Sequence, residues 1–160
     1  MIARRIFLTR GIALAGMAAF AYPFGVRAAQ EDFPFALSDE DWRERLSDME
    51  YLVLRQHGTE HAFTSPLDKF YEPGVYHCAG CDAALYASEV KYDSRTGWPS
   101  FWESLPDAIG TSTDTAFMMV RTECHCANCG GHLGHIFDDG PPPTGKRHCI
   151  NGVALRFAPA

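Results

Sequence analysis

From Gly74 onward, apolar and polar residues alternate in short runs. Runs of this length and period are typical of β-strands, and Gly, Pro, Asp and Asn separate them as turn residues do. The pattern predicts six strands, at VYHC (75–78), ALYAS (84–88), PSFWESL (99–105), AFMMVRTECHC (116–126), HIFD (135–138) and INGVALRF (150–157). No internal repeat interrupts the series, so we expect one antiparallel β domain.

Between residues 38 and 58 the pattern instead favours two short helices. Ser38 precedes a run of acidic residues, which is typical of an N-cap followed by the first helical turn. Ser47 and Glu50 have the spacing of a capping box, and Gly58 is expected to end the second helix. The predicted fold class is therefore mainly β with short N-terminal helices, in a domain over residues 38–160 that follows a linker over residues 29–37.

The first 28 residues have the three-part pattern of an export signal. A basic start is followed by an apolar run over residues 11–26 and by small residues around Ala28. The motif Arg-Arg-x-Phe-Leu, which begins at Arg4, resembles a twin-arginine signal. An ordinary secretory signal and an uncleaved anchor are the alternatives, but the apolar run is shorter than the about 20 residues of a membrane span. We expect cleavage after Ala28, a periplasmic or other extracytoplasmic location, and no stable membrane anchoring afterwards.

Cleavage would make an acidic chain more acidic. The full chain has 14 basic and 20 acidic residues, a net charge of -6. Four arginines and no acidic residue lie in the first 28 positions, so the mature chain would have 10 basic residues and a net charge of -10. Because nucleic-acid binding requires a basic surface, we expect no nucleic-acid partner.

Two CxxC pairs stand where predicted strands end in turns. Two such turns facing each other would bring four thiolates to one tetrahedral site, as in closed structural zinc sites. The expected ligands of one structural Zn²⁺ are Cys78, Cys81, Cys126 and Cys129. Disulfides are the alternative in an oxidising compartment, although a CxxC disulfide is usually a redox device. Cys124, His125 and His132 are near enough in sequence to compete as ligands, and the symmetry of the two pairs favours the four cysteines.

Cys149 has no CxxC partner. A free cysteine is most often a small buried hydrophobic residue, and half of a disulfide is a second possibility. However, Lys146, Arg147 and His148 directly precede it, and positive charge stabilises a thiolate. Asn151 is expected on the same side of one continuous strand. These neighbours favour a nucleophile.

The segment GGHLGH contains two histidines three residues apart, His132 and His135. Either histidine would serve as a proton donor if the fold brought it near Cys149. The alternatives are a packing role and a role in supporting the zinc ligands.

These residues lie in blocks that resemble the B-type methionine sulfoxide reductases, which reduce the R epimer of methionine sulfoxide. The blocks are TGWPSFW (96–102), CGGHLGHIFDDGP (129–141) and RHCINGVALRF (147–157). Weaker likeness extends over about residues 40–157, and the blocks occur in the family's order. The resemblance implies two antiparallel sheets, the four zinc cysteines named above, a nucleophile at Cys149 and a substrate pocket formed by Trp98, His132, His135 and Asn151.

The implied chemistry agrees with the residue types. A sulfoxide needs a soft nucleophile at sulfur and an acid at oxygen. Cys149 would attack the sulfur, His135 would protonate the oxygen, Trp98 would face the S-methyl group, and Cys149 would end as a sulfenic acid. The expected partners are oxidised methionine in peptides or proteins and a thioredoxin-like reductant, and the expected role is repair of oxidised exported proteins.

The chain departs from the family in two places. Many members have a resolving cysteine where this chain has Thr96, which leaves Cys124 as the other thiol outside the CxxC pairs. Because Cys124 and Cys126 alternate onto one side of a strand, we expect Cys124 to be buried and an external thiol to reduce the sulfenic acid. His148 replaces a frequent tyrosine, and it either lowers the pKa of the thiol or replaces a packing ring.

Two other functions compete with this interpretation. A non-catalytic zinc module that binds a peptide or nucleic acid would explain the CxxC pairs but not Cys149. A dithiol oxidoreductase would use one CxxC pair as its active site and would hold little zinc.

Overall fold

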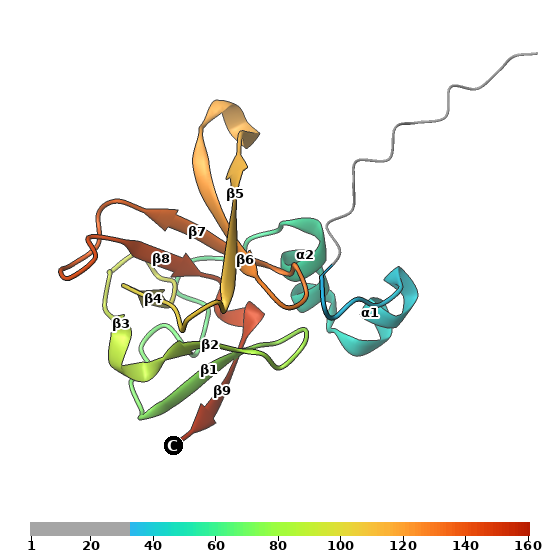
Figure 1. The fold of residues 1–160 in the computed structure, drawn as a ribbon, viewed down its shortest axis with the longest axis horizontal. Helices are drawn as coiled ribbons and strands as arrows, with labels where there is room; N and C mark the ends of the chain where they lie inside the picture. Colours follow the sequence, from blue (N-terminus) through green and yellow to red (C-terminus); the bar gives the residue numbers. More distant parts are fainter. Residues whose placement is uncertain (1–32) are drawn as a thin grey trace, which may run out of the picture. The chain divides into compact units, whose positions relative to one another are not determined.

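The computed structural model describes residues 33–160 of the chain (Figure 1). The expected signal, its cleavage site and the first part of the linker lie outside the described residues. Within the described part, no helix has the length and apolar character needed to cross a membrane. The helices are α1 (Asp39–Arg45) and α2 (Asp48–Gln56). The strands are β1 (Gly74–Cys78), β2 (Ala84–Ala87), β3 (Lys91–Tyr92), β4 (Ser100–Phe101), β5 (Ile109–Asp114), β6 (Arg121–Cys126), β7 (His132–Phe137), β8 (Arg147–Ile150) and β9 (Leu155–Pro159).

The strands form two antiparallel sheets, as the resemblance implies. The smaller sheet has the order β2-β1-β9, and the larger has the order β3-β4-β8-β7-β6-β5. The last two strands therefore lie in different sheets, and the short connection between them crosses from one sheet to the other. The mainly β fold class with two short N-terminal helices is confirmed.

Both helices begin at the predicted caps. The Ser38 side chain caps α1, and Ser47 and Glu50 form both hydrogen bonds of the capping box of α2. The end of α2 differs from the prediction, because the residue in the left-handed conformation is His57 (φ 55°) and not Gly58. Gly58 is instead needed for space, since a Cβ atom there would collide with the last turn of α2.

The run 150–157 is not one strand, contrary to the prediction. A 3₁₀ turn, Gly152–Ala154, separates β8 from β9. Glu60 causes this break: its carboxylate accepts hydrogen bonds from the backbone N–H groups of Gly152 and Val153. Those N–H groups are therefore unable to continue a strand ladder.

The hairpin of β5 and β6 also differs from the predicted pattern. Strand β5 (IGTSTD) has too few apolar residues to be recognised, and it is a strand because it pairs with β6 along its whole length at the sheet edge. The apolar residues before β6 form a 3₁₀ turn, Ala116–Met118, at the hairpin tip. The hairpin projects from the rest of the sheet, and Met118 at its tip is fully exposed (Figure 1).

Aromatic rings of the core connect the two sheets. Tyr86 of β2 stacks on Phe101 of β4 with the ring centroids 4.3 Å apart, and Tyr76 of β1 meets the same ring edge-on at 5.1 Å. Each such pair contributes about 0.5–1.5 kcal/mol beyond its burial. These contacts fix β4 against the smaller sheet, and β4 in turn pairs with β8, which carries Cys149.

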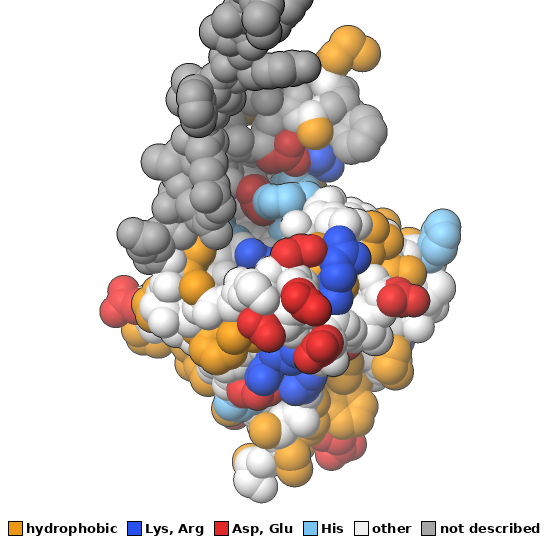
Figure 2. Space-filling view, turned by 90° about the vertical axis from the view of Figure 1, so that its right-hand side faces the viewer, with side chains coloured by type: hydrophobic (Ala, Val, Ile, Leu, Met, Phe, Trp, Pro, Cys, Tyr) orange, Lys and Arg blue, Asp and Glu red, His pale blue; other side chains and the backbone are white. Residues whose placement is uncertain are grey.

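The surface of the described residues agrees with the acidic composition. On the face in Figure 2, acidic and basic side chains are interspersed, and no extended basic patch is visible among the described residues. Elsewhere among the described residues, charged side chains form ion pairs, such as Arg147 with Asp139 at 2.8 Å. This face offers no basic surface for a nucleic acid.

Candidate active site and candidate metal centre

The four cysteines of the CxxC pairs meet in one place, and we call them the four-cysteine cluster. Cys78 Sγ lies 3.7 Å from Cys129 Sγ, and Cys81 Sγ lies 3.6 Å from Cys126 Sγ. All four sulfurs lie within 4.8 Å of one another. A tetrahedral zinc with Zn–S bonds of about 2.3 Å would require sulfur separations of about 3.8 Å. The residues therefore fit a metal ion.

The cluster joins the two sheets. Cys78 ends β1 of the smaller sheet, and Cys126 ends β6 of the larger one. Two close sulfur contacts run between the two CxxC pairs, and no described cysteine is in a disulfide. This arrangement opposes both the disulfide alternative and a dithiol active site in one CxxC pair.

Two arginines attach the helices to the turns of the cluster. Arg45 of α1 donates to the Gly80 carbonyl at 2.6 Å, and Arg55 of α2 donates to the Cys129 carbonyl at 3.0 Å. Each hydrogen bond occupies a carbonyl that a tight turn would otherwise leave to solvent. The two N-terminal helices therefore hold the turns of the cluster in place through these hydrogen bonds.

The three competing ligand residues are used elsewhere. The Cys124 thiol lies 3.5 Å from the Tyr86 hydroxyl, and His132 Nδ1 lies 2.7 Å from Glu123 Oε1. His125 packs edge-on against Phe33. The four cysteines are the ligand set that the geometry brings together.

Cys149 lies on β8 in a row of residues that crosses the larger sheet. In register, Cys149 pairs with His135 of β7 on one side and with Ser100 of β4 on the other, and His135 pairs with Glu123 of β6. Directly opposed residues share one face of a sheet and have Cβ atoms about 4.5–5.5 Å apart. His135 is therefore the cross-strand neighbour of the thiol.

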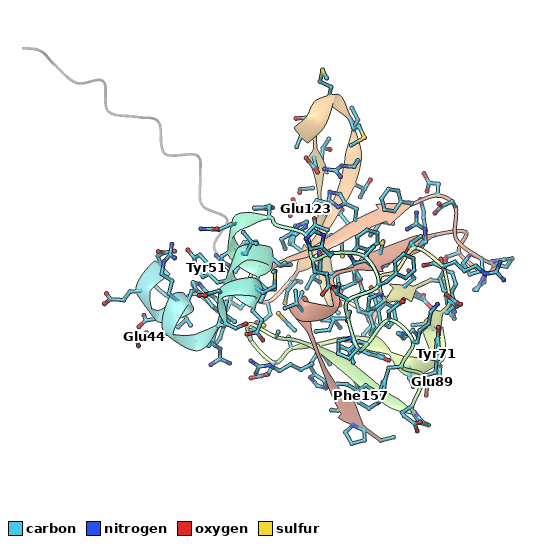
Figure 3. The ribbon with its side chains drawn as sticks, turned by 180° about the vertical axis from the view of Figure 1, so that it is seen from behind. Glu44, Tyr51, Tyr71, Glu89, Glu123 and Phe157 are labelled. Atoms are coloured by element: carbon cyan, nitrogen blue, oxygen red, sulfur yellow. The ribbon has the colours of Figure 1, made fainter. Side chains whose placement is uncertain are left out.

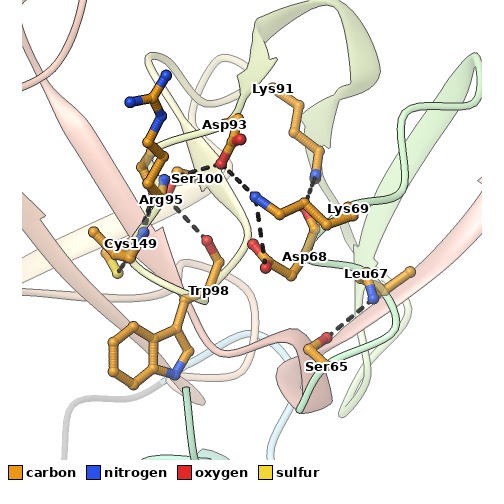
Figure 4. A network of polar contacts seen from close by, with 12 residues as sticks. Ser65, Leu67, Asp68, Lys69, Lys91, Asp93, Arg95, Trp98, Ser100 and Cys149 are labelled. Carbon is orange, nitrogen blue, oxygen red and sulfur yellow. Dashed lines mark hydrogen bonds and ion pairs between the residues drawn. The ribbon is translucent and has the colours of Figure 1, made fainter. Parts of the chain in front are cut away.

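The thiol and His135 open into a pocket of about 150 Å³, and Trp98 forms part of its wall. The other lining residues are Thr59, Arg121, Gly134, Phe137 and Asn151. In Figure 4, Cys149 and the Trp98 indole lie close together beside Ser100. The pocket combines a nucleophilic atom, an imidazole and an aromatic face.

Two glycines shape this pocket. Gly97, with a φ of 89°, makes the turn that presents Trp98, and its carbonyl accepts the Phe63 N–H at 2.8 Å. Gly134 lets β7 approach the backbone of β8, because a Cβ atom at this position would collide with the Cys149 carbonyl oxygen. Both close approaches require a residue without a side chain.

Glu60 holds two residues of the pocket wall, Trp98 and Asn151, and the sequence did not indicate this role. Its backbone carbonyl accepts the Trp98 indole N–H at 3.2 Å, and its N–H donates to Asn151 Oδ1 at 3.0 Å. Its buried carboxylate holds the turn after Asn151, and burial raises the pKa of this carboxyl group. Glu60 lies in GTE, inside the region of weaker likeness, but nothing in its spacing to Cys149 indicates that they meet.

Asn151 lines the pocket. The prediction that it continues the strand of Cys149 is wrong, because β8 ends at Ile150. The Asn151 side chain bridges two backbone segments, accepting from the Glu60 N–H at 3.0 Å and donating to the Leu133 carbonyl at 2.9 Å. One amide hydrogen and one lone pair are left for other partners. Asn151 therefore connects β7 to the Glu60 loop.

A β-bulge brings His132 and His135 onto the same face. In a regular strand, residues three apart point to opposite sides. Here the register between β6 and β7 shifts, so that Glu123 pairs with His135 while His125 pairs with His132. Leu133 is the extra residue, and its carbonyl bonds Asn151. The two imidazole centroids are consequently 5.5 Å apart.

The Cys149 thiol is protonated in the free protein. Burial raises its pKa above the ordinary 9.0, and the Thr96 hydroxyl and the Arg147 charge only partly offset this effect. Arg147 itself forms a bidentate pair with Asp139 at 2.8 and 2.9 Å. Arg147 therefore favours the thiolate, in the direction expected for a basic neighbour, but burial has the larger and opposite effect on the pKa.

His148 replaces a packing ring, which decides between the two roles left open for it. It is buried on the opposite side of β8 from Cys149, with Nδ1 3.2 Å from the Tyr86 hydroxyl and the two rings edge-to-face. Burial lowers the pKa of His148 to about 4, so the ring is neutral at pH 7. Lys146 is also turned away, in an ion pair with Asp138.

His135 is neutral at pH 7 as well. Burial lowers the pKa of its imidazole, although Asp114, whose Oδ2 lies 2.7 Å from His135 Nε2, acts in the opposite direction. Asp114 lies at the end of β5 and also pairs with Arg121 at 2.6 Å. The end of β5 next to the hairpin tip thus holds the histidine.

The chain's similarity to known proteins agrees with this site. Residues 46–159 match the SelR domain family. The peptide methionine sulfoxide reductase MsrB of Agrobacterium fabrum is 54% identical over 123 residues, which cover 76% of this chain and 91% of that protein. The MsrB proteins of Thioalkalivibrio sulfidiphilus and Leptospira interrogans are 49% and 50% identical over 131 and 121 residues, covering 81% and 75% of this chain and 96% and 92% of those proteins.

The mainly β fold and these similarities define an oxidoreductase. The chain belongs to the SelR family, the B-type methionine sulfoxide reductases. Membership excludes the alternative of a non-catalytic zinc module.

Proposed function

We propose that the protein reduces methionine-R-sulfoxide in peptides and proteins, with Cys149 as nucleophile and His135 as the proton donor. The observation that carries this proposal is the cross-strand pair of thiol and imidazole at a pocket walled by Trp98. The family of the chain supports the substrate class and the epimer.

In the first step the Cys149 sulfur attacks the sulfoxide sulfur. The thiol proton passes through His135 to the sulfoxide oxygen. The S–O bond of the substrate then breaks as the hydroxyl group passes to the Cys149 sulfur, and the bond between the two sulfurs breaks. Methionine leaves with two more electrons than the sulfoxide had, and Cys149 becomes a sulfenic acid. Trp98 faces the S-methyl group, and Asn151 lines the pocket beside it. His132 does not line the pocket and acts on it through His135, whose ring centroid lies 5.5 Å away.

The sulfenic acid is reduced by an external thiol. Thr96, at the position of the family's resolving cysteine, has only a hydroxyl group 3.9 Å from the Cys149 sulfur. Cys124 is fully buried and pairs in register with Gly134, the neighbour of His135, so its side chain faces the side of the sheet opposite to Cys149. Two strand spacings of about 4.8 Å also exceed the reach of a disulfide.

A thioredoxin-like dithiol supplies the electrons. Its first thiol displaces water from the sulfenic acid and forms a mixed disulfide with Cys149. Its second thiol then breaks that disulfide and restores the Cys149 thiol. The open rim of the pocket supports access by such a partner.

The four-cysteine cluster holds one zinc ion with a structural role. Zinc is satisfied by four thiolates and has no redox chemistry that would damage them. The four cysteines would hold the ion, which would offset part of the negative charge of the thiolates and link the ends of β1 and β6. The separation of the cluster from the Cys149 pocket supports a structural rather than catalytic ion.

The enzyme repairs oxidised exported proteins after twin-arginine export to the periplasm. The Arg-Arg-x-Phe-Leu motif and the short apolar run support this location. A variant with Arg4→Lys and Arg5→Lys should remain in the cytoplasm as precursor, as fractionation would measure. Normal export of that variant would favour the general secretory route.

Turnover of separate R and S epimers tests the proposed function. A short peptide with methionine-R-sulfoxide should be reduced, and the S epimer should not. The free amino acid should be a poorer substrate than the peptide. Equal turnover of the two epimers, or turnover of S alone, would be incompatible with the proposal.

A further inference from the structure

A second group of metal-ligating side chains lies beside the Cys149 pocket. His57 follows α2, Glu123 lies on β6 and His132 lies on β7, so three separate elements contribute one side chain each. Their ligand atoms lie within 4.8 Å of one another. In Figure 3, Glu123 lies between the end of α2 and the base of the β5–β6 hairpin.

The three side chains converge on one oxygen atom. His57 Nδ1 lies 2.9 Å and His132 Nδ1 lies 2.7 Å from the same atom, Glu123 Oε1. The other carboxylate oxygen accepts a hydrogen bond from Ser112 at 2.6 Å, which fixes the orientation of the carboxylate. A ligand held by an outer partner in this way is typical of metal sites.

The donor set suits a borderline divalent metal. Two imidazoles and a carboxylate are common ligands of zinc and neighbouring metals, at distances of about 2.0–2.2 Å. An ion between the three atoms would replace the hydrogens that now join each nitrogen to the oxygen. The N···O separations would open from 2.7 and 2.9 Å to about 3.3 Å, and the displaced Nδ1 hydrogens would move to Nε2.

The group is open on one side, unlike the four-cysteine cluster. The His57 side chain is 66% exposed, whereas His132 is 2% exposed at the bottom of the group. The recess above it is also lined by Asp114, Thr113 and Thr115. Histidine and acidic side chains lie together in a hollow on the face shown in Figure 2.

We propose that His57, Glu123 and His132 form a second, exchangeable site for a divalent transition metal such as Zn²⁺, and that metal there inhibits the enzyme. Water fills the remaining coordination positions. The recess shares Thr59, Arg121 and His135 with the Cys149 pocket. The ion and its water would therefore crowd these three residues, which also line the pocket for the sulfoxide. The inhibitory effect rests on the proposed function, and the binding of metal does not.

Calorimetry on the zinc-loaded Cys149→Ser protein tests binding, since this variant removes a competing thiol. Added ZnCl₂ should bind as a second equivalent beyond the one in the four-cysteine cluster. His57→Asn in the same background should weaken this second event at least about tenfold, because asparagine tolerates the left-handed conformation of residue 57 but lacks the imidazole. His61→Ala, a change at an exposed histidine in the same loop, is the matched control and should bind as before.

A single-turnover assay on the wild-type enzyme tests inhibition without an added thiol that would bind the metal. Excess zinc should slow methionine formation in the wild type and in His61→Ala, and much less in His57→Asn. Absence of a second equivalent, or equal affinity in His57→Asn, would overturn the site. Binding without any slowing would overturn the inhibitory role. If the reductase activity itself were absent, calorimetry would still report on the site.

Discussion

The four-cysteine cluster and the Cys149 pocket place the same side chain in opposite surroundings. In the cluster, each sulfur has other sulfurs within 4.8 Å, on turns that belong to both sheets. Cys149 has a hydroxyl oxygen at 3.9 Å and an imidazole as its cross-strand neighbour. Thiolates that share one metal ion are poor nucleophiles. A single thiol beside a histidine is available to a substrate.

The two regions also differ in how they are held. The turns of the cluster accept hydrogen bonds from an arginine of each helix, and the cluster joins the ends of β1 and β6. The Cys149 pocket is open at its rim, and its thiol remains protonated because burial raises the pKa. The four-cysteine cluster is therefore a centre of stability, and the Cys149 pocket is a centre of reaction.

The largest effect is expected from Cys78→Ala. Structural zinc contributes about 10–16 kcal/mol to the folding of small zinc peptides, which equals or exceeds the about 5–15 kcal/mol total stability of a domain. Loss of one ligand should therefore release zinc and unfold the protein, as metal analysis and circular dichroism would measure. Cys124→Ser is the control at a buried cysteine outside the cluster, and it should keep zinc. A folded, active Cys78→Ala protein without zinc would remove the structural role.

Cys149→Ser should lower turnover at least about 10³-fold, because a neutral hydroxyl is a far weaker nucleophile than a thiol that can ionise. Zinc content and the midpoint of thermal unfolding should stay close to those of the wild type. Cys124→Ser should retain most of its thioredoxin-dependent turnover. If Cys149→Ser lost zinc together with activity, the two regions would not be separable in the way described here.

His135→Asn should lower turnover about 10²–10⁴-fold, the usual contribution of general acid–base catalysis. The loss should appear mainly in kcat, since the pocket wall of Trp98 is unchanged. His148→Tyr is a matched substitution of the packing ring on the other side of the sheet, and its kcat should stay near that of the wild type. A larger loss of kcat in His148→Tyr than in His135→Asn would show that His135 is not the proton donor.

The pH profile of kcat/KM should be a broad bell. The pKa of His135 is below 6.5 and that of Cys149 is above 9.0, so thiol and imidazole are both neutral between these values. The reactive thiolate–imidazolium form has the same number of protons as the neutral pair, and its fraction is therefore constant across this range. At low pH the rate should fall because both His135 and the thiol are protonated. At high pH it should fall because no proton is left on His135 for the sulfoxide oxygen. A rate that rises steadily to pH 9 would exclude His135 as the acid.

Much of this architecture could be predicted from the sequence. The helix caps Ser38 and Ser47 and the two CxxC turns are local signals, because the residues that form each feature are neighbours in the chain. The burial of Cys124 also followed from strand alternation with Cys126. The assignment of Cys149 drew on both its basic neighbours and the family blocks. Of those neighbours, Arg147 lowers the pKa of the thiol, whereas His148 and Lys146 are turned away from it.

The remainder depends on contacts that no local pattern contains. Strand β5 has a polar sequence and exists through its pairing with β6. The break after Asn151 is made by Glu60, more than ninety positions earlier in the chain. The common face of His132 and His135 results from a register shift between two strands. Each of these features arises only when distant segments meet.

Trapping the oxidised cysteine tests the central claim most directly. One equivalent of methionine-R-sulfoxide peptide is added without a reductant, in the presence of a sulfenic-acid trapping reagent, and the cysteines are assigned by mass spectrometry. We expect the trapped adduct at Cys149 alone, with the four cluster cysteines unmodified and zinc retained. A Cys124–Cys149 disulfide, or oxidation within the cluster with release of zinc, would contradict this expectation.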